Sequence, residues 1–219
     1  MSEIIERSTN ESLLWLLRDL VPHRRLSYSE SLRIAELQAN HLLEHFAVRG
    51  PRVPSELVSE LPRIEVRYDA DVPVSGSAHW EHSTWIITLN AAEPKTRQRF
   101  SLMHEFKHII DHTTKDYLYG DTAGELAAGQ RAERAADQFA ACLLMPKRWL
   151  KSAWFKSGQD VAALASRLQV SPRALYVRLW HLGLGTDSRR CPTSVRPYHR
   201  TSNSIYLRLT SQPVGVAAP

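Results

Sequence analysis

HEFKH, residues 104–108, and ERAADQFAACLLMP, residues 133–146, are the two stretches that decide how this sequence folds. The apolar neighbours of the first stretch recur at helical spacing. Histidines at i and i+4 of a helix lie one turn apart on one face, so both imidazoles can reach one metal ion at about 2.0–2.1 Å. His104 and His108 are therefore candidate metal ligands, with zinc the expected metal, and Glu105 is the candidate catalytic base.

A second helix, predicted from about 129 to 145, offers the third ligand that a catalytic zinc site needs. Glu133 and Asp137 stand at i and i+4 on this helix. Glu133 can then reach the metal, while Asp137 accepts a hydrogen bond from a ligand imidazole and fixes its tautomer. From these residues alone, the alternative stays open that Glu133 belongs to a solvated run of charges.

Other histidines also occur at suggestive spacings. HLLEH, residues 41–45, fits the inverted pattern H-x-x-E-H of another class of metallopeptidase. Its helix follows no strand and has no equally convincing partner helix, so we interpret His41 and His45 as residues of a solvent-facing helix rim. His112 lies about 80° around its helix from His104, which favours a supporting or structural role over ligation.

The remaining pattern favours an α+β fold with a small antiparallel sheet and mostly helices. Two strand-like runs, residues 64–68 and 85–89, are rich in β-branched and aromatic residues, with Ser-Gly-Ser turn chemistry between them. We expect these two runs to pair as antiparallel strands. Apolar periodicity and proline stops predict helices at residues 29–47, 55–60, 96–112, 129–145, 159–169 and 172–182, the last two forming a helix-turn-helix-like pair.

Composition limits the class of protein. With 219 residues, 43% of them hydrophobic, the chain can bury a substantial core. No apolar run approaches the roughly 18 residues of a membrane span. Two cysteines are too few for a disulfide framework. We therefore expect a cytoplasmic protein that does not associate with a membrane.

Charge divides the chain at Pro146. Residues 1–146 carry 16 Lys and Arg against 21 Asp and Glu, whereas residues 147–219 carry 12 against 2. A basic segment of this kind often meets nucleic acid or an acidic partner, although a solvated basic surface is about as common. Beyond Gly185, prolines and small residues predict a poorly ordered tail.

The two opening stretches together resemble the ImmA/IrrE family of bacterial and phage metallo-endopeptidases. In that family, H-E-x-x-H is followed by a helix of the form E-x-x-A-N-x-F-A-x-x-L-L-M-P. The resemblance covers roughly residues 30–185 and implies a zincin-like metallopeptidase fold. The units that we expect are a metallopeptidase domain in residues 1–156, helix-turn-helix-like helices in 157–185 and a basic, disordered tail in 186–219.

The resemblance assigns roles residue by residue. It makes His104, His108 and Glu133 the metal ligands and Glu105 the catalytic base. Asp137 stands where the family usually has Asn, and either side chain can accept a hydrogen bond from a ligand imidazole. One Zn²⁺ per chain is implied, with Mn²⁺ as an alternative occupant.

The function that the resemblance implies is that of a zinc-dependent endopeptidase acting on a helix-turn-helix transcriptional repressor. Cleavage would relieve repression, in a stress response or within a mobile element. The rival hypothesis is a DNA-binding transcriptional regulator with a structural or vestigial metal site. A third hypothesis is that the basic part binds the acidic surface of the repressor. The arginines available for phosphate contacts are those at positions 173, 178, 189, 190, 196 and 200.

Three further expectations concern the substrate. An extended peptide would add a strand to an exposed edge of the sheet, near residues 85–89. The transition-state oxyanion needs a hydrogen-bond donor, and Tyr117, Tyr119 and Tyr176 are candidates among which the sequence does not choose. Lys107 occupies a position that is often glycine in the family, so its side chain should point away from the metal or disfavour a cationic substrate.

Overall fold

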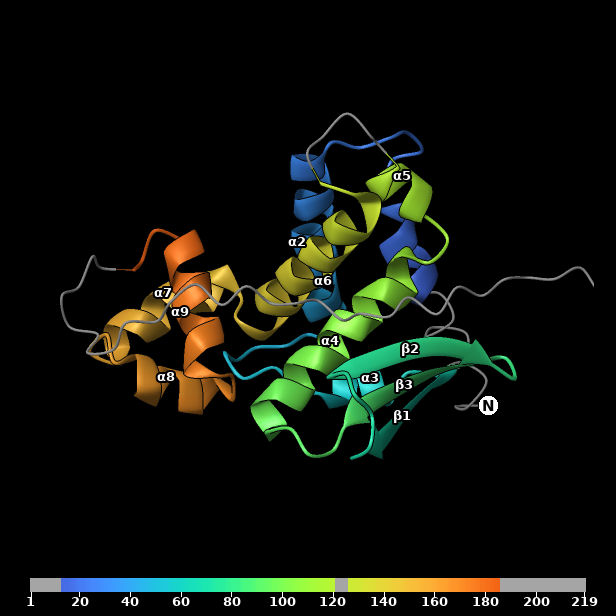
Figure 1. The fold of residues 1–219 in the computed structure, drawn as a ribbon. Helices are drawn as coiled ribbons and strands as arrows, with labels where there is room; N and C mark the ends of the chain where they lie inside the picture. Colours follow the sequence, from blue (N-terminus) through green and yellow to red (C-terminus); the bar gives the residue numbers. More distant parts are fainter. Residues whose placement is uncertain (1–12, 121–125, 186–219) are drawn as a thin grey trace, which may run out of the picture.

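The computed structural model describes residues 13–120 and 126–185, and shows a small sheet among many helices (Figure 1). Residues 13–19 are helical. The elements that follow are α2 (Tyr28–His45), α3 (Glu56–Ser59), β1 (Ile64–Asp69), β2 (Gly76–Glu81), β3 (Thr84–Asn90), α4 (Lys95–Asp111), α5 (Lys115–Tyr119), α6 (Ala128–Leu144), α7 (Lys147–Lys156), α8 (Val161–Leu168) and α9 (Pro172–His181). The α+β class is confirmed, whereas the predicted disordered tail, 186–219, lies outside the described residues.

The sheet has three strands in the order β1-β3-β2 and is mixed. The predicted antiparallel pairing of the first and last strand is wrong, because β1 runs parallel to β3, with Ile64 opposite Trp85. The antiparallel partner of β3 is β2, a strand that we did not predict. His82 and Ser83 form the two-residue turn between them with φ of 43° and 63°. A tight two-residue hairpin turn requires two left-handed residues, so this turn lets β2 fold back and pair with one edge of β3. Strand β1 pairs with the other edge.

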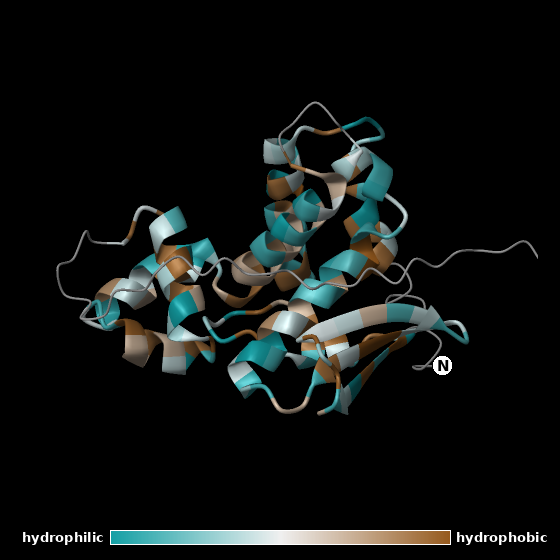
Figure 2. Ribbon diagram, in the orientation of Figure 1, coloured by the Kyte–Doolittle hydropathy of each residue, from teal (hydrophilic) through white to brown (hydrophobic). Residues whose placement is uncertain are grey.

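The core lies between the sheet, α4, α6 and α2. Helix α4 packs on the face of the sheet that carries Ile87 and Leu89, both of which are buried. Helix α6 packs on α4, where the rings of Phe106 and Phe139 lie 6.2 Å apart, and α2 packs on α6. Strand β3 is coloured as mostly hydrophobic in Figure 2, whereas β2 is more hydrophilic. The apolar stripes of three helices and one face of the sheet thus close one core.

Capping groups explain where two of the helices, α2 and α9, begin. Ser27 and Glu30 form a capping box at α2, in which the Ser27 N–H donates to Glu30 at 2.8 Å and the Glu30 N–H donates to the Ser27 hydroxyl at 3.4 Å. At α9, the hydroxyl of Ser171 accepts from the Ala174 N–H at 3.1 Å, and proline occupies the first helical turn. Helices α8 and α9 lie where two helices were predicted, and they contact each other.

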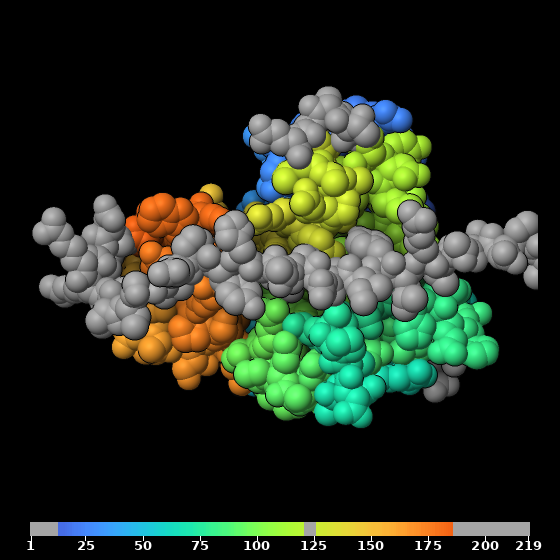
Figure 3. Space-filling model, viewed as in Figure 1, coloured from blue at the N-terminus to red at the C-terminus, as the bar shows by residue number. Residues whose placement is uncertain are grey.

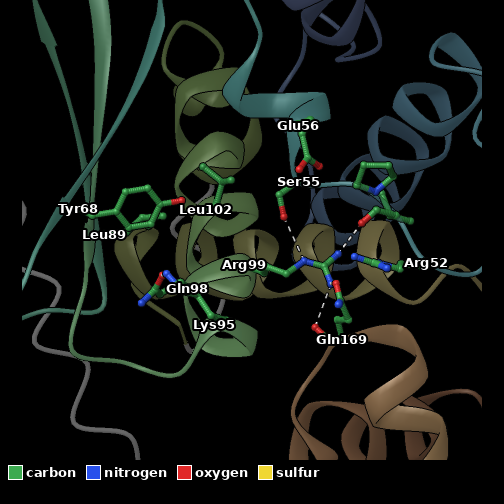
Figure 4. A pocket seen from close by; sticks show the side chains of 12 residues that line it. Arg52, Ser55, Glu56, Tyr68, Leu89, Lys95, Gln98, Arg99, Leu102 and Gln169 are labelled. Carbon is green, nitrogen blue, oxygen red and sulfur yellow. Dashed lines mark hydrogen bonds between the residues drawn. The ribbon is translucent and has the colours of Figure 1, made fainter.

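Two arginines tie the C-terminal helices to the rest of the chain. Arg99 on α4 lies in a pocket, where it donates to the Ser55 hydroxyl at 3.1 Å and to the Gln169 carbonyl at 3.0 Å (Figure 4). Arg178 on α9 is buried and donates to the Met145 carbonyl at 3.3 Å. Helices α7, α8 and α9 form one end of the molecule in Figure 3. No helix among the described residues is long and apolar enough to cross a membrane.

Candidate metal centre

Helix α4 positions three of the predicted site residues. It has no glycine and no proline between Lys95 and Asp111, so its hydrogen bonding continues unbroken past the residues of the HEFKH stretch. Arg18 supports the end of the helix by donating to the carbonyls of Ile109 and Ile110, each at 2.9 Å. The Ile109 carbonyl also accepts from the His112 N–H at 3.4 Å, so Arg18 adds to the hydrogen bonding of the last turn. The helix is thus held at the end that carries the second histidine.

Three side chains from two helices converge at one point. The Nε2 atoms of His104 and His108 lie 3.2 Å apart. Oε2 of Glu133, on α6, lies 3.4 Å from Nε2 of His104. Oε1 of Glu133 lies 3.3 Å from Nε2 of His108. In the part of the chain that the structure describes, these residues are the one group of three or more His, Cys, Asp or Glu whose ligand atoms all lie within 4.8 Å of one another.

These spacings fit a zinc ion. Two ligand atoms that each lie about 2.0–2.2 Å from a tetrahedral Zn²⁺ are about 3.3–3.6 Å apart, close to all three observed distances. Oε1 of Glu133 is buried and has no hydrogen-bond partner of its own, although it faces His108. A buried acceptor without a partner is costly unless a cation compensates it. Two imidazoles and one carboxylate are also the donor set of a catalytic zinc site, so the residues present fit the metal.

Asp137 orients the first histidine. Its Oδ1 lies 3.0 Å from Nδ1 of His104, so Nδ1–H donates to the carboxylate and Nε2 is turned towards Glu133 and His108. Burial lowers the pKa of His104, but the hydrogen bonds to Asp137 and Glu133 outweigh burial and raise this pKa to about 9. The metal-free centre therefore holds a proton at neutral pH that a metal ion would have to displace.

Glu133 responds in the opposite direction. Burial raises the pKa of its carboxyl, but the contacts with His104 and His108 outweigh burial and hold the pKa far below its usual range. Its carboxylate is therefore ionised at every pH at which the protein would be expected to work. The alternative in which Glu133 lies in a solvated run of charges is wrong, because its side chain is only 18% exposed and faces two histidines.

Glu105 lies against the first residue of β2. Glu105 is 8% exposed. A Cβ atom added at Gly76 would lie 3.1 Å from Cγ of Glu105 and 3.4 Å from Oε1 of the same side chain. The missing side chain at Gly76 therefore leaves room for the glutamate between α4 and the sheet. We did not predict this role for Gly76, although a glycine in a strand often marks a close approach by another group.

The other candidates lie away from the centre. Lys107 points into the core, where it is fully buried and forms an ion pair with Asp111. Tyr119 donates its hydroxyl to the same carboxylate, which commits it to a structural contact. His112 packs edge-on against Trp85, with the rings 5.1 Å apart, in agreement with a structural role.

The remaining tyrosines and the second histidine motif are also placed. Tyr117 stacks on His23, with ring centroids 5.9 Å apart, and Tyr176 is exposed on α9. Within the described residues, His41 and His45 on α2 belong to no group of three or more potential ligands, in agreement with the helix-rim interpretation.

Comparison with known proteins places this arrangement in a family. The model of the Peptidase M78 family, described as the IrrE N-terminal-like domain, matches residues 64–180. A search of curated proteins finds no match. A solved structure of a Mycobacterium tuberculosis transcriptional regulator is similar in fold, with a TM-score of 0.56 and 18% identity over 76% of this chain and 51% of that one. The chain thus spans about half of that structure. The matched residues include the whole sheet and every side chain of the candidate metal centre, and the chain belongs to the IrrE N-terminal-like, or Peptidase M78, family.

Proposed function

We propose that the chain is a zinc-dependent endopeptidase. The observation that carries this proposal is the convergence of His104, His108 and Glu133 within 4.8 Å, on the helix pair that also bears Glu105 and Asp137. Mn²⁺ is the alternative occupant, because two imidazoles and a carboxylate do not select strictly between the two ions. Family membership supports a peptidase-type domain, and the proposal adds the activity itself.

The chain's own residues have distinct tasks in this proposal. A bound Zn²⁺ supplies Lewis-acid activation of the scissile carbonyl and lowers the pKa of water to about 7. Glu105 accepts the proton of the attacking water and later delivers it to the leaving amine. Asp137 keeps the Nδ1 proton on His104, so that the Nε2 lone pair remains available to the metal.

The substrate would enter along β2. The predicted entry near residues 85–89 is wrong, because β3 is the central strand and its two edges are occupied by β1 and β2. Strand β2 has no strand partner on its outer side within the described residues, and it packs beside α4. An extended peptide would pair its main chain with this edge, which brings its backbone past Glu105.

The proposed substrate is a helix-turn-helix transcriptional repressor, whose cleavage would relieve repression in the cytoplasm, in a stress response or within a mobile element. The similarity in fold to a Mycobacterium tuberculosis transcriptional regulator supports a role in transcriptional regulation. The basic character of residues 147–219, with 12 Lys and Arg against 2 Asp and Glu, supports contact with an acidic surface of the repressor.

The second candidate function is a DNA-binding regulator in which the metal site is structural or vestigial. The presence of the α8–α9 pair favours it, and Arg173 at the start of α9 is exposed. One observation speaks against DNA binding: Arg178 is buried and donates to the Met145 carbonyl, so its side chain is not exposed for contact with a DNA phosphate. The arginines at 189, 190, 196 and 200 lie outside the described residues.

The test compares the zinc-loaded protein with Glu105→Gln on a mixture of unstructured peptides and on the helix-turn-helix protein encoded nearest to its gene. The proposal expects cleavage by the parent and none by the variant, with equal zinc content in both. Cleavage that is unchanged in Glu105→Gln contradicts the mechanism. Absence of cleavage, together with DNA binding that weakens steeply with salt, favours the regulator instead.

A further inference from the structure

Strand β2 presents its side chains to two different surroundings. Gly76, Ala78 and Trp80 pair with Leu89, Ile87 and Trp85 of β3, and alternate residues of a strand point to the same face. Because a Cβ atom at Gly76 would lie 3.1 Å from Cγ of Glu105, this face is the one that looks towards α4 and the candidate centre. Trp80 therefore lies on the same face as the proposed catalytic base.

Trp80 belongs to a row of three aromatic rings in edge-to-face contact. Its ring lies 5.4 Å from that of Trp85 at an interplanar angle of 62°, and Trp85 lies 5.1 Å from His112 at 75°. His112 caps the C-terminal end of α4, so the row joins the strand hairpin to the helix that carries the centre. Edge-to-face contacts of this kind hold aromatic rings in fixed orientations.

The outer ring of this row is open. Trp80 is 44% exposed, although it is among the largest apolar side chains of the protein. The opposite face of β2 is polar, with His79 and Arg67 each within 4.0 Å of the Glu81 carboxylate, at 3.7 Å and 3.8 Å. The apolar surface of the strand is thus restricted to the face that looks towards the centre. Tryptophan is among the side chains that most often supply the binding energy at an interface.

We propose that Trp80, Trp85 and His112 form an aromatic subsite that receives a large apolar side chain of the peptide lying along β2. This inference rests on the proposed peptidase function and names the class of substrate. Trp80 is four residues from Gly76, which is about 13 Å of extended strand. A paired peptide advances by the same amount, so the residue that meets the subsite is about four positions from the residue beside Glu105.

The parity of this spacing matters. Residues of a strand that are separated by an even number point to the same face. If one residue of the peptide lies beside Glu105, the residue four positions away therefore points to the same face and meets Trp80. For a peptide antiparallel to β2, that residue is N-terminal to the scissile bond. Phe, Trp, Leu or Met at this position would cover the exposed ring and exclude water from it.

The first experiment records the cleavage sites that the zinc-loaded protein makes in a mixture of peptides, by mass spectrometry. The parent is expected to enrich Phe, Trp, Leu and Met at one position three to five residues from the bond. Trp80→Ala should reduce this enrichment about tenfold. Trp80→Phe keeps a ring and should retain most of it. His79→Ala, on the polar face of the same strand, is the matched control and should leave the profile unchanged.

The second experiment separates this subsite from the peptidase activity. Zinc-loaded Glu105→Gln is immobilised, and the peptides that it retains are compared with those retained by Glu105→Gln/Trp80→Ala. Preferential retention of apolar peptides that depends on Trp80 supports the subsite even where no bond is cleaved. Equal retention by both variants overturns it. A cleavage profile that is unchanged in Trp80→Ala, or lost equally in His79→Ala, overturns it as well.

Discussion

Oδ1 of Asp137 lies 3.0 Å from Nδ1 of His104, so a carboxylate on α6 holds the Nδ1 proton of a histidine on α4. The same histidine turns its Nε2 towards Glu133, one helical turn before Asp137 on α6. The two helices are thus joined by one imidazole that is contacted at both nitrogens. Changes at either carboxylate should therefore alter metal binding in different ways.

Replacing Asp137 should weaken metal binding without abolishing it. Asp137→Ala leaves the His104 ring without its partner, and loss of such a supporting hydrogen bond costs about 10–100-fold in metal affinity. Asp137→Asn, which can still accept from Nδ1–H, should lose less. Competition with a chromophoric zinc chelator measures both affinities. Equal affinities for the parent and Asp137→Ala would show that the contact is dispensable.

Removal of Glu133 should have a larger effect. Glu133→Ala deletes the only carboxylate of the three-residue group, and the protein should then be purified with much less than one zinc per chain. Glu105→Gln is the matched control, because it changes a neighbouring glutamate and should keep the metal. Elemental analysis of both proteins gives the answer. A normal zinc content in Glu133→Ala would remove it from the ligand set.

Zinc affinity should rise with pH up to about 9, where the raised pKa of His104 lies. Below that pKa the ring must lose a proton to bind the metal, so affinity changes about tenfold per pH unit. The stability of the metal-free chain should follow the reverse trend with pH, and fall as the pH rises. A raised pKa stabilises the fold fully below 6.5, the ordinary value of the group, and this contribution is lost as the pH rises through about 9.

Titration calorimetry of zinc binding between pH 6 and 10, in buffers of different ionisation enthalpy, tests this dependence. The release of about one proton per zinc at pH 7 is expected, falling towards zero above pH 9. In Asp137→Ala, where the first of the two supporting hydrogen bonds is missing, the plateau should begin at lower pH. A flat affinity profile across this range is the contrary result.

A side chain at position 76 should disturb catalysis more than metal binding. In Gly76→Ala the new Cβ would lie 3.1 Å from Cγ of Glu105 and 3.3 Å from Cδ2 of Leu89, so the glutamate must shift. Displacement of a catalytic group by about 1 Å can cost about 100-fold in rate, and the shift of a few tenths of an ångström required here should cost less than that. The zinc content should stay normal. Ser77→Ala, on the outer face of the same strand, serves as the control, and equal rates in both variants would argue against the crowding.

Removing one partner of the buried pair of Lys107 and Asp111 should strongly destabilise the chain. Both side chains are almost fully buried, and burial lowers the pKa of Lys107, so its ammonium depends on Asp111. Asp111→Asn leaves that charge uncompensated and should destabilise the chain by about 3–5 kcal/mol. Urea unfolding measures the loss. Arg67→Ala, which breaks an exposed pair with Glu65, should have a much smaller effect and is the comparison.

Most of the helices and the residues of the candidate centre were predictable because their signals are local, although α5 and α7 were not predicted. Spacings of three and four residues place His104, His108 and Glu133 on helix faces, and the helix bounds agree with the structure within one or two residues. The contact of Glu133 with both histidines depends on tertiary structure. The spacing of residues within α6 indicated that Glu133 could reach a metal, but the distances follow from the packing of α6 on α4.

The sheet was harder because its order depends on a turn with an unusual sequence. The pair His82 and Ser83 adopts two left-handed conformations that Asn-Gly commonly supplies, so the hairpin gave no recognisable signal. The strand GSAHWE, residues 76–81, has few β-branched residues. Helix α7 was missed although its signal exists, since Leu150, Ala153 and Trp154 follow helical spacing and are buried.

Among residues 13–120 and 126–185, the outer edge of β2 has no strand partner, which also bears on solubility. An unpaired edge strand is a template on which a second copy could add its own strand, and chains of such contacts lead to aggregation. The outer face of β2 carries Ser77, His79 and Glu81, of which Glu81 is held close to Arg67. Charge at a strand edge discourages such contacts between identical copies. A substitution that removes the Glu81 charge should therefore cause the protein to precipitate at high concentration while the metal centre is still unchanged.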